Sequence, residues 1–179
     1  MTQIGVSIAV PEPFGGRLRE KRAEFGDPQA ATVPSHVTLL PPDDVGSTCL
    51  EVVRGALADV AAQFAPFEMT LQGTGTFRPV SPVVFVAVSR GISETELLAT
   101  RLRDAVGPPP SGFPFHPHVT VAQDLDEAVL DRAYTELADF TCDFVVREFC
   151  LYLHDDETGW QPDQCFLLRG PAAQAGVPS

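Results

Sequence analysis

Two short segments hold the residues best suited to chemistry in this chain, His36-Val37-Thr38 and His118-Val119-Thr120. Each lies in an apolar run typical of a β-strand. A strand places alternate side chains on one face, so the histidine and the threonine of a triplet point the same way. An imidazole has an unperturbed pKa of about 6.5, so two facing imidazoles provide an acid and a base. The threonine hydroxyls can donate hydrogen bonds to a phosphate held between them.

The recurrence of the triplet is informative because histidine is rare in this chain. Only four histidines are present, and two of them open an identical triplet. A single copy would favour a structural histidine beside threonine, a common strand residue. The two copies lie nearly half a chain length apart, which indicates a duplicated unit and favours a catalytic pair.

The elements that must position the triplets alternate between strand and helix patterns. Besides the two motif strands, strand patterns cover 3–10, 67–77 and 83–89, helical patterns cover 11–26, 47–64, 93–107 and 126–140, and a closing hairpin is expected from 142–156 and 160–170. Each half thus contains a motif strand, a helix and further strand. We therefore predict an α+β fold with two pseudo-twofold-related lobes of mainly antiparallel sheet and flanking helices around a central groove. A single bilobal domain is expected over residues 1–170, with a mobile tail at 171–179.

Charge and composition limit the possible partners. The net charge of −12 disfavours duplex DNA, whereas a small phosphate-bearing ligand in a cleft is compatible with it. No run approaches the roughly 18 apolar residues of a membrane helix, and the N-terminal residues lack the basic leader of a signal peptide. We expect a cytoplasmic monomer with no membrane partner. The four cysteines, none in a Cys-x-x-Cys pair, are expected to be free buried thiols: Cys49, Cys142, Cys150 and Cys165.

Four segments resemble the 2H phosphoesterase superfamily, which includes bacterial 2′-5′ RNA ligase-like proteins and 2′,3′-cyclic phosphodiesterases. They are "PSHVTLLPP", "GTGTFRPVSPVVFVAV", "FPFHPHVTVA" and "VVREFCLYLHDDETGWQPDQCFLL". The resemblance extends from the first strand to about Leu168. It implies that His36, Thr38, His118 and Thr120 line a groove between two lobes. Relatives often carry basic residues where this chain has Gln123 and Ser81-Pro82, which weakens the case for a polynucleotide substrate.

The function predicted from these residues is metal-independent hydrolysis of 2′,3′-cyclic phosphodiesters of nucleotides or RNA ends. His118 is predicted to act as the base and His36 as the acid, although the near-symmetry leaves the reverse assignment open. Two alternatives are a 2′-5′ RNA ligase and a non-catalytic nucleotide- or phosphate-binding module. The sequence has no obvious basic patch to hold two polynucleotide ends, which disfavours the ligase. The paired histidines disfavour the binding module, because phosphate binding needs no matched acid and base.

Three aromatic residues are candidates for stacking on a nucleobase: Phe77, Tyr152 and Trp160. Core or rim packing is the alternative for each of them. Arg78 could replace the missing positive charge, or it could be a solvated loop residue.

His116 could orient His118, bind substrate, or serve only as a structural residue. The His-x-His pair also raises a metal site formed by His116, His118 and His36. No carboxylate or cysteine at a recognised ligand spacing joins these histidines, so neither a metal nor another cofactor is expected.

Overall fold

The computed structural model describes residues 3–44, 49–106 and 114–171. In chain order the elements are β1 (Gln3–Ala9), α1 (Phe14–Glu24), the 3-10 helix η1 (Pro28–Ala31), β2 (His36–Asp44), α2 (Leu50–Ala61), β3 (Phe67–Thr76), β4 (Val83–Arg90), α3 (Ile92–Val106), β5 (His118–Gln123), α4 (Glu127–Glu136), β6 (Thr141–Val146), β7 (Glu148–Asp155) and β8 (Gly159–Leu167). Within these described ranges, no helix combines the length and apolar character needed to cross a membrane. Of the expected mobile tail at 171–179, residues 172–179 lie outside the described residues.

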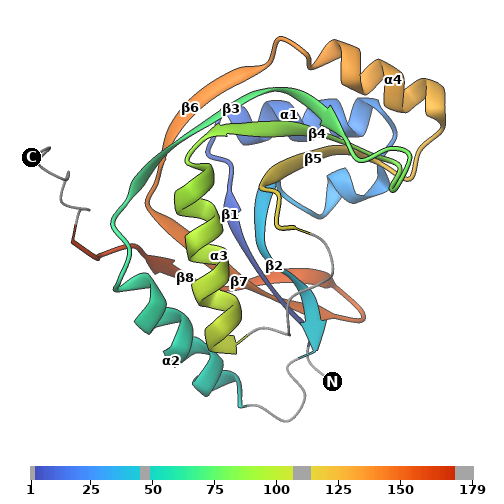
Figure 1. Cartoon of the computed structure of the whole chain (residues 1–179). Coiled ribbons are helices and arrows are strands. Elements are labelled where there is room, and N and C mark those ends of the chain that lie inside the picture. Colours follow the sequence, from blue (N-terminus) through green and yellow to red (C-terminus); the bar gives the residue numbers. More distant parts are fainter. Residues whose placement is uncertain (1–2, 45–48, 107–113, 172–179) are drawn as a thin grey trace, which may run out of the picture.

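The strands form two four-stranded antiparallel sheets (Figure 1). The His36 sheet has the order β2-β1-β7-β8, and the His118 sheet has the order β5-β4-β3-β6. The two motif strands, β2 and β5, each lie at one edge of their sheet and contact each other. The predicted α+β fold with two antiparallel lobes is confirmed, and the contact between the edges places the motifs at the junction of the lobes.

The two sheets do not coincide with the two halves of the sequence. The His118 sheet is continuous in the chain, from β3 to β6, whereas the His36 sheet combines β1 and β2 with β7 and β8 from the other end. The segment 142–156, expected as one arm of a hairpin, divides at Arg147 into β6 and β7, which belong to different sheets. The hairpin of β7 and β8 is confirmed.

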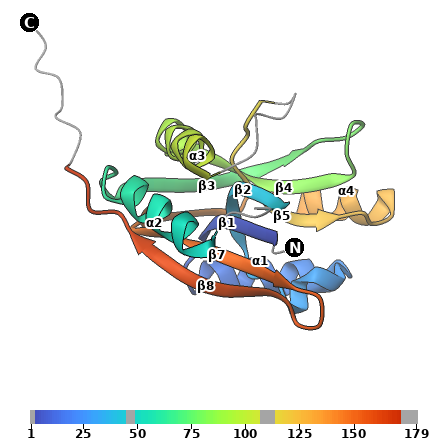
Figure 2. The same ribbon diagram turned by 90° about the horizontal axis from the view of Figure 1, so that it is seen from below.

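The four α-helices divide between the two sheets. Helix α3 contacts β2 and α2 contacts β8, while α1 and α4 both contact β5 in the other sheet. Figure 2 shows α3 and α1 on opposite sides of the molecule. Helices α2 and α3 contact each other, and α1 is joined to α4 by a Lys21–Glu136 ion pair of 3.3 Å. Each sheet is therefore contacted by one pair of helices.

The motif strands share one burial pattern over their first five residues. The alternate residues Val37, Leu39, Val119 and Val121 are fully buried against the helices. The histidines and threonines between them are half-buried on the other face. Burial of each aliphatic side chain contributes about 1.5–3 kcal/mol, and a slip of one residue would exchange the two faces. The core therefore determines which way the motif side chains point.

The expectation of four free buried thiols is wrong. Cys150 of β7 and Cys165 of β8 are directly opposite in the hairpin, with a Cα–Cα distance of 4.0 Å, and form a disulfide. Cys49 and Cys142 are free, and Cys49 is exposed. The pairing depends on the register of β7 against β8, which the spacing of cysteines in the sequence does not define.

Candidate active site

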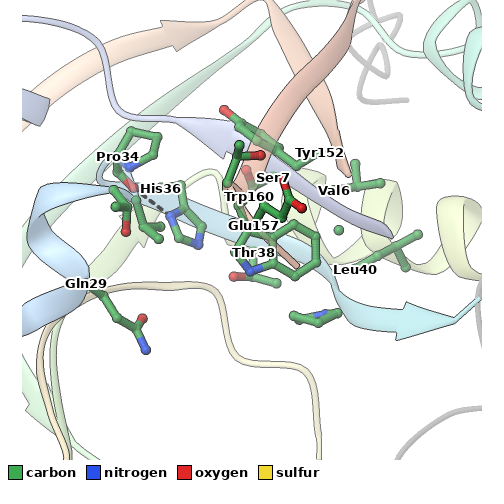
Figure 3. Close-up of a pocket in the computed structure, with 16 residues that line it drawn as sticks. Val6, Ser7, Gln29, Pro34, His36, Thr38, Leu40, Tyr152, Glu157 and Trp160 are labelled. Carbon is green, nitrogen blue, oxygen red and sulfur yellow. Dashed lines mark hydrogen bonds between the residues drawn. The ribbon is translucent and has the colours of Figure 1, made fainter. Parts of the chain in front are cut away.

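The imidazoles of the two motifs are held in the same way. The Nδ1 atom of His36 lies 2.7 Å from the carbonyl oxygen of Pro34 (Figure 3), and the Nδ1 atom of His118 lies 2.7 Å from that of His116. A carbonyl oxygen only accepts hydrogen bonds, so each Nδ1 is the donor and carries a proton. The neutral ring then has its lone pair on Nε2, where it can accept a proton, and the charged ring can donate one there.

Burial lowers the pKa of both imidazoles. For His36 the largest cause is burial, and the nearby charge of Arg22 acts in the same direction. For His118 burial is again the largest cause, and the charges of His116 and His36 act in the same direction. Strands β2 and β5, which carry the two rings, contact each other at the junction of the sheets. Both rings favour the neutral form in the free protein.

The motif threonines hold their hydroxyls free on the same faces. Thr38 and Thr120 are half-buried, and in the described part of the chain neither hydroxyl has a hydrogen-bond partner. The strand neighbours of His36 and His118 are Ala9 and Ala87, respectively. Each motif histidine therefore lies opposite a small side chain on the next strand.

A cavity of about 530 Å³ lies beside His36. His36 and Thr38 line it together with residues of β1, β7 and β8, whereas His118 and Thr120 do not line it. Figure 3 shows Ser7, Tyr152 and Trp160 grouped around His36 and Thr38. Its size is typical of a site for a small molecule.

Two predicted contact residues, Tyr152 and Trp160, line this cavity. Burial raises the pKa of the Tyr152 phenol, so the ring is uncharged, and Ser7 lines the cavity beside it. The Trp160 ring lies over Gly5, where an added Cβ would be 3.5 Å from Cζ3. Its edge meets the His154 ring at a centroid distance of 5.1 Å. Both aromatic rings are therefore fixed by neighbours while keeping a face toward the cavity.

The third aromatic candidate, Phe77, lies beside the other histidine. Its ring centroid is 4.9 Å from that of His118 and 4.6 Å from that of Phe85. Phe85 is also 5.1 Å from His118, and His116 is 5.2 Å from Phe85. Three rings, those of Phe77, Phe85 and His116, thus pack around His118, whereas the cavity lies beside His36.

Arg78 is engaged by carboxylates of α4. Its guanidinium lies 2.6 Å from Glu127 and 2.9 Å from Asp131. Its positive charge is therefore compensated. His116, the other candidate next to the second motif, orients His118 through its backbone carbonyl, in the same way that Pro34 orients His36.

No basic side chain lines the cavity. The chain has 12 lysines and arginines, all of them within the described ranges, and none is among the lining residues. The cation that acts on His36 is Arg22, which is buried and bonded to Asp27 at 2.7 Å. Arg22 also donates to the Oε1 atom of Gln29 at 3.2 Å, and Gln29 lines the cavity.

Several lining residues were not predicted from the sequence: Gly5, Ser7, Gln29 and Glu157. Ser7 offered one signal, since it interrupts the apolar strand pattern of 3–10. Gly5 has no side chain, Gln29 lies in η1 and Glu157 lies in the turn between β7 and β8, and nothing in their spacing connects them to the motifs.

The predicted alternative of a three-histidine metal site has no matching cluster within the ranges that the structure covers. The group there whose atoms are close enough to hold a metal ion is Glu148, Cys150 and Cys165. Its two sulfur atoms are bonded to each other.

Comparison with known proteins agrees with this arrangement. Residues 10–158 match the model of the 2′-5′ RNA ligase superfamily. The chain therefore belongs to this superfamily, the LigT-like group of 2H phosphoesterases. It is 30% identical over 168 residues to a protein of Oceanobacillus iheyensis named "Putative phosphoesterase", covering 92% of this chain and 96% of that protein.

Solved structures show the same fold. A crystal structure of Escherichia coli LigT with 3′-AMP has a TM-score of 0.64 and 25% identity, covering 93% of this chain and 98% of LigT. A Thermus thermophilus protein matches with a TM-score of 0.64 and 24% identity, covering 94% of this chain and 98% of its own. Another LigT structure contains ATP; it is 24% identical with a TM-score of 0.61 and covers 93% of this chain and 98% of LigT.

Proposed function

We propose that this protein hydrolyses 2′,3′-cyclic phosphodiesters of nucleotides, with His36 and His118 as an acid-base pair. The observation that carries the proposal is the matched fixing of the two imidazoles, each with Nδ1 bound to a carbonyl oxygen two residues earlier. This leaves both Nε2 atoms for proton transfer. Membership of a phosphoesterase superfamily and the 3′-AMP in the LigT structure support a nucleotide substrate.

The reaction needs one proton removed and one supplied. The Nε2 atom of His118 takes a proton from water as the water oxygen bonds to phosphorus. The bond from phosphorus to one ribose oxygen breaks, and His36 donates its Nε2 proton to that oxygen, giving a nucleoside monophosphate. Thr38 and Thr120 donate hydrogen bonds to the non-bridging oxygens, where negative charge increases in the transition state.

The roles of the two histidines follow from the position of the cavity. In a 2′,3′-cyclic nucleotide the leaving oxygen belongs to the ribose, so the acid must lie on the nucleoside side. The cavity large enough for a nucleoside is beside His36. The attacking water needs little room, and the aromatic rings around His118 leave little. His36 is therefore assigned as acid and His118 as base.

The other site residues predicted from the sequence are assigned binding or positioning roles in this proposal. Tyr152 and Trp160 stack on the base, because both present ring surface to the cavity. Phe77 packs on His118 and holds its ring. Arg78, through its ion pairs to α4, fixes the backbone next to Phe77. His116 orients His118 through its carbonyl oxygen.

The test is turnover of nucleoside 2′,3′-cyclic phosphates in the presence of EDTA. His36→Ala and His118→Ala should each lower kcat by at least about 10²-fold, and the double variant should lose little more, because the two groups act as a unit. His154→Ala is the matched control, since this histidine contacts Trp160 but does not line the cavity or touch the reacting atoms. It should retain kcat.

Two outcomes would overturn the proposal. Loss of activity on chelation, restored by zinc or manganese, would point to metal chemistry. Binding of a nucleotide by the folded wild-type protein without any turnover would favour a binding module.

A further inference from the structure

The cavity beside His36 has a polar mouth that is acidic. Glu157 lines it, and Figure 3 shows Glu157 in the same part of the cavity as Tyr152 and Trp160. Glu157 is exposed, and its carboxylate has no hydrogen-bond or ionic partner among the residues that the structure covers. The mouth therefore offers two hydrogen-bond acceptors and a negative charge.

The turn that carries Glu157 is held in place by its own hydrogen bonds. The backbone N–H groups of Glu157 and Thr158 donate to the Oδ1 atom of Asp155 at 2.9 and 2.8 Å. These bonds lower the pKa of Asp155, which favours its ionised, accepting form. The Glu157 backbone is thus positioned before any ligand enters.

The charge beside Glu157 disfavours an anionic group in that part of the cavity, away from His36 and Thr38. Every lysine and arginine of the chain lies within the described ranges, and none lines the cavity, so a phosphate chain would meet Glu157 without a compensating cation. The walls formed by Tyr152, Trp160 and Leu40 are flat or apolar. An uncharged planar ring with N–H donors on its edge suits both features.

We propose that this cavity is a nucleobase subsite selective for guanine, read by the carboxylate of Glu157. Guanine presents two parallel donors, N1–H and the 2-amino group, which match the two oxygens of a carboxylate. Adenine and cytosine place one amino donor beside an unprotonated ring nitrogen, which would face a carboxylate oxygen. Uracil places its single N–H between two carbonyl groups. This inference rests on the proposed function and specifies its substrate as guanosine 2′,3′-cyclic phosphate.

The experiment compares kcat/KM for the 2′,3′-cyclic phosphates of guanosine, inosine, adenosine, cytidine and uridine. Guanosine should be preferred over adenosine by about 5- to 150-fold, the range for one bidentate pair, and inosine, which lacks the 2-amino group, should fall between them. Glu157→Gln should lower kcat/KM for guanosine far more than for uridine and so remove most of the guanosine preference. Asp156→Asn is the matched control. It removes one negative charge from the same turn, at a fully exposed residue that does not line the cavity.

The outcomes separate this inference from the function on which it rests. Equal turnover of all five bases, or an unchanged guanosine preference in Glu157→Gln, would overturn the guanine subsite and leave the phosphodiesterase intact. If no cyclic nucleotide is hydrolysed, the proposed function fails. The subsite is then judged by calorimetry with guanosine and adenosine 3′-monophosphates. Tighter binding of the guanosine compound that is lost in Glu157→Gln would support it, and equal binding would overturn it.

Discussion

The two His-x-Thr motifs have the same local structure but different surroundings. In each sheet one residue lies directly opposite the motif threonine on the next strand, Ser7 in the His36 sheet and Phe85 in the His118 sheet. The small serine leaves room for the cavity beside His36, whereas the Phe85 ring packs against His118. A single pair of equivalent positions thus makes one side of a nearly symmetric site suited to a large group and the other to a small one.

A second pair of equivalent residues repeats this difference. On β7, Cys150 lies opposite Ser7, and Tyr152 follows two residues later. On β3, Gly75 lies opposite Phe85, and Phe77 follows two residues later. Tyr152 lines the cavity, while Phe77 packs on His118. Equivalent aromatic positions therefore line the cavity on one side and pack against the motif histidine on the other.

The largest expected effect is a difference in rate loss between the His36 and His118 variants that depends on the leaving group of the substrate. With bis(p-nitrophenyl) phosphate the leaving phenolate needs no proton, so His36→Ala should lose less than about tenfold, against at least about 10²-fold with a cyclic nucleotide. His118→Ala should lose at least about 10²-fold with both substrates, because the water still needs a base. Steady-state rates with the two substrates test this. The reverse pattern would exchange the roles of acid and base.

The aromatic pair should separate binding from rate. Tyr152→Ala removes a stacking surface worth about 1–3 kcal/mol and should raise KM for a cyclic nucleotide with little change in kcat. Phe77→Ala loosens His118 and should lower kcat by about 10- to 10²-fold with little change in KM. Tyr152→Phe, which keeps the ring, is the control and should stay close to wild type. If both alanine variants changed KM alone, the two sides would not differ in function.

The pH dependence tests the electrostatics that both sides share. The profile of kcat/KM reports ionisations of the free protein, and burial holds the pKa of each histidine below 6.5. The acid is lost as pH rises through its lowered pKa, and the base is lost as pH falls through its own. We expect an optimum below 6.5 and a fall of about tenfold per pH unit on the alkaline side. An optimum above neutrality would contradict the direction of these shifts.

The smallest effect concerns packing and is measured as the free energy of unfolding in urea. A Cβ at Gly75 would lie 2.5 Å from the Phe85 ring, so Gly75→Ala should destabilise the protein by about 1–3 kcal/mol. A Cβ at Gly5 would lie 3.5 Å from Trp160, an ordinary contact. Gly5→Ala should therefore be neutral or slightly stabilising. Equal losses of unfolding free energy in Gly75→Ala and Gly5→Ala would contradict the expected difference in packing between the two sheets.

The sequence by itself determined the direction of the motif side chains and the α+β class. Strand alternation is local, and apolar residues such as Val37 and Val119 must be buried, so His36 and His118 have to face away from the core. The identical spacing of histidine and threonine then supplies the same pair of groups twice. These features depend only on neighbours a few residues apart.

The tertiary structure decided what surrounds each motif. Strands β7 and β8, which follow β6 in the chain, complete the sheet that holds His36. Their pairing beside β1 brings Tyr152 and Trp160 to the cavity. The position of Ser7 opposite Thr38 and the disulfide of Cys150 depend on the same strand order and register. Long-range register is set by packing over the whole core, and no local pattern records which distant strand becomes a neighbour.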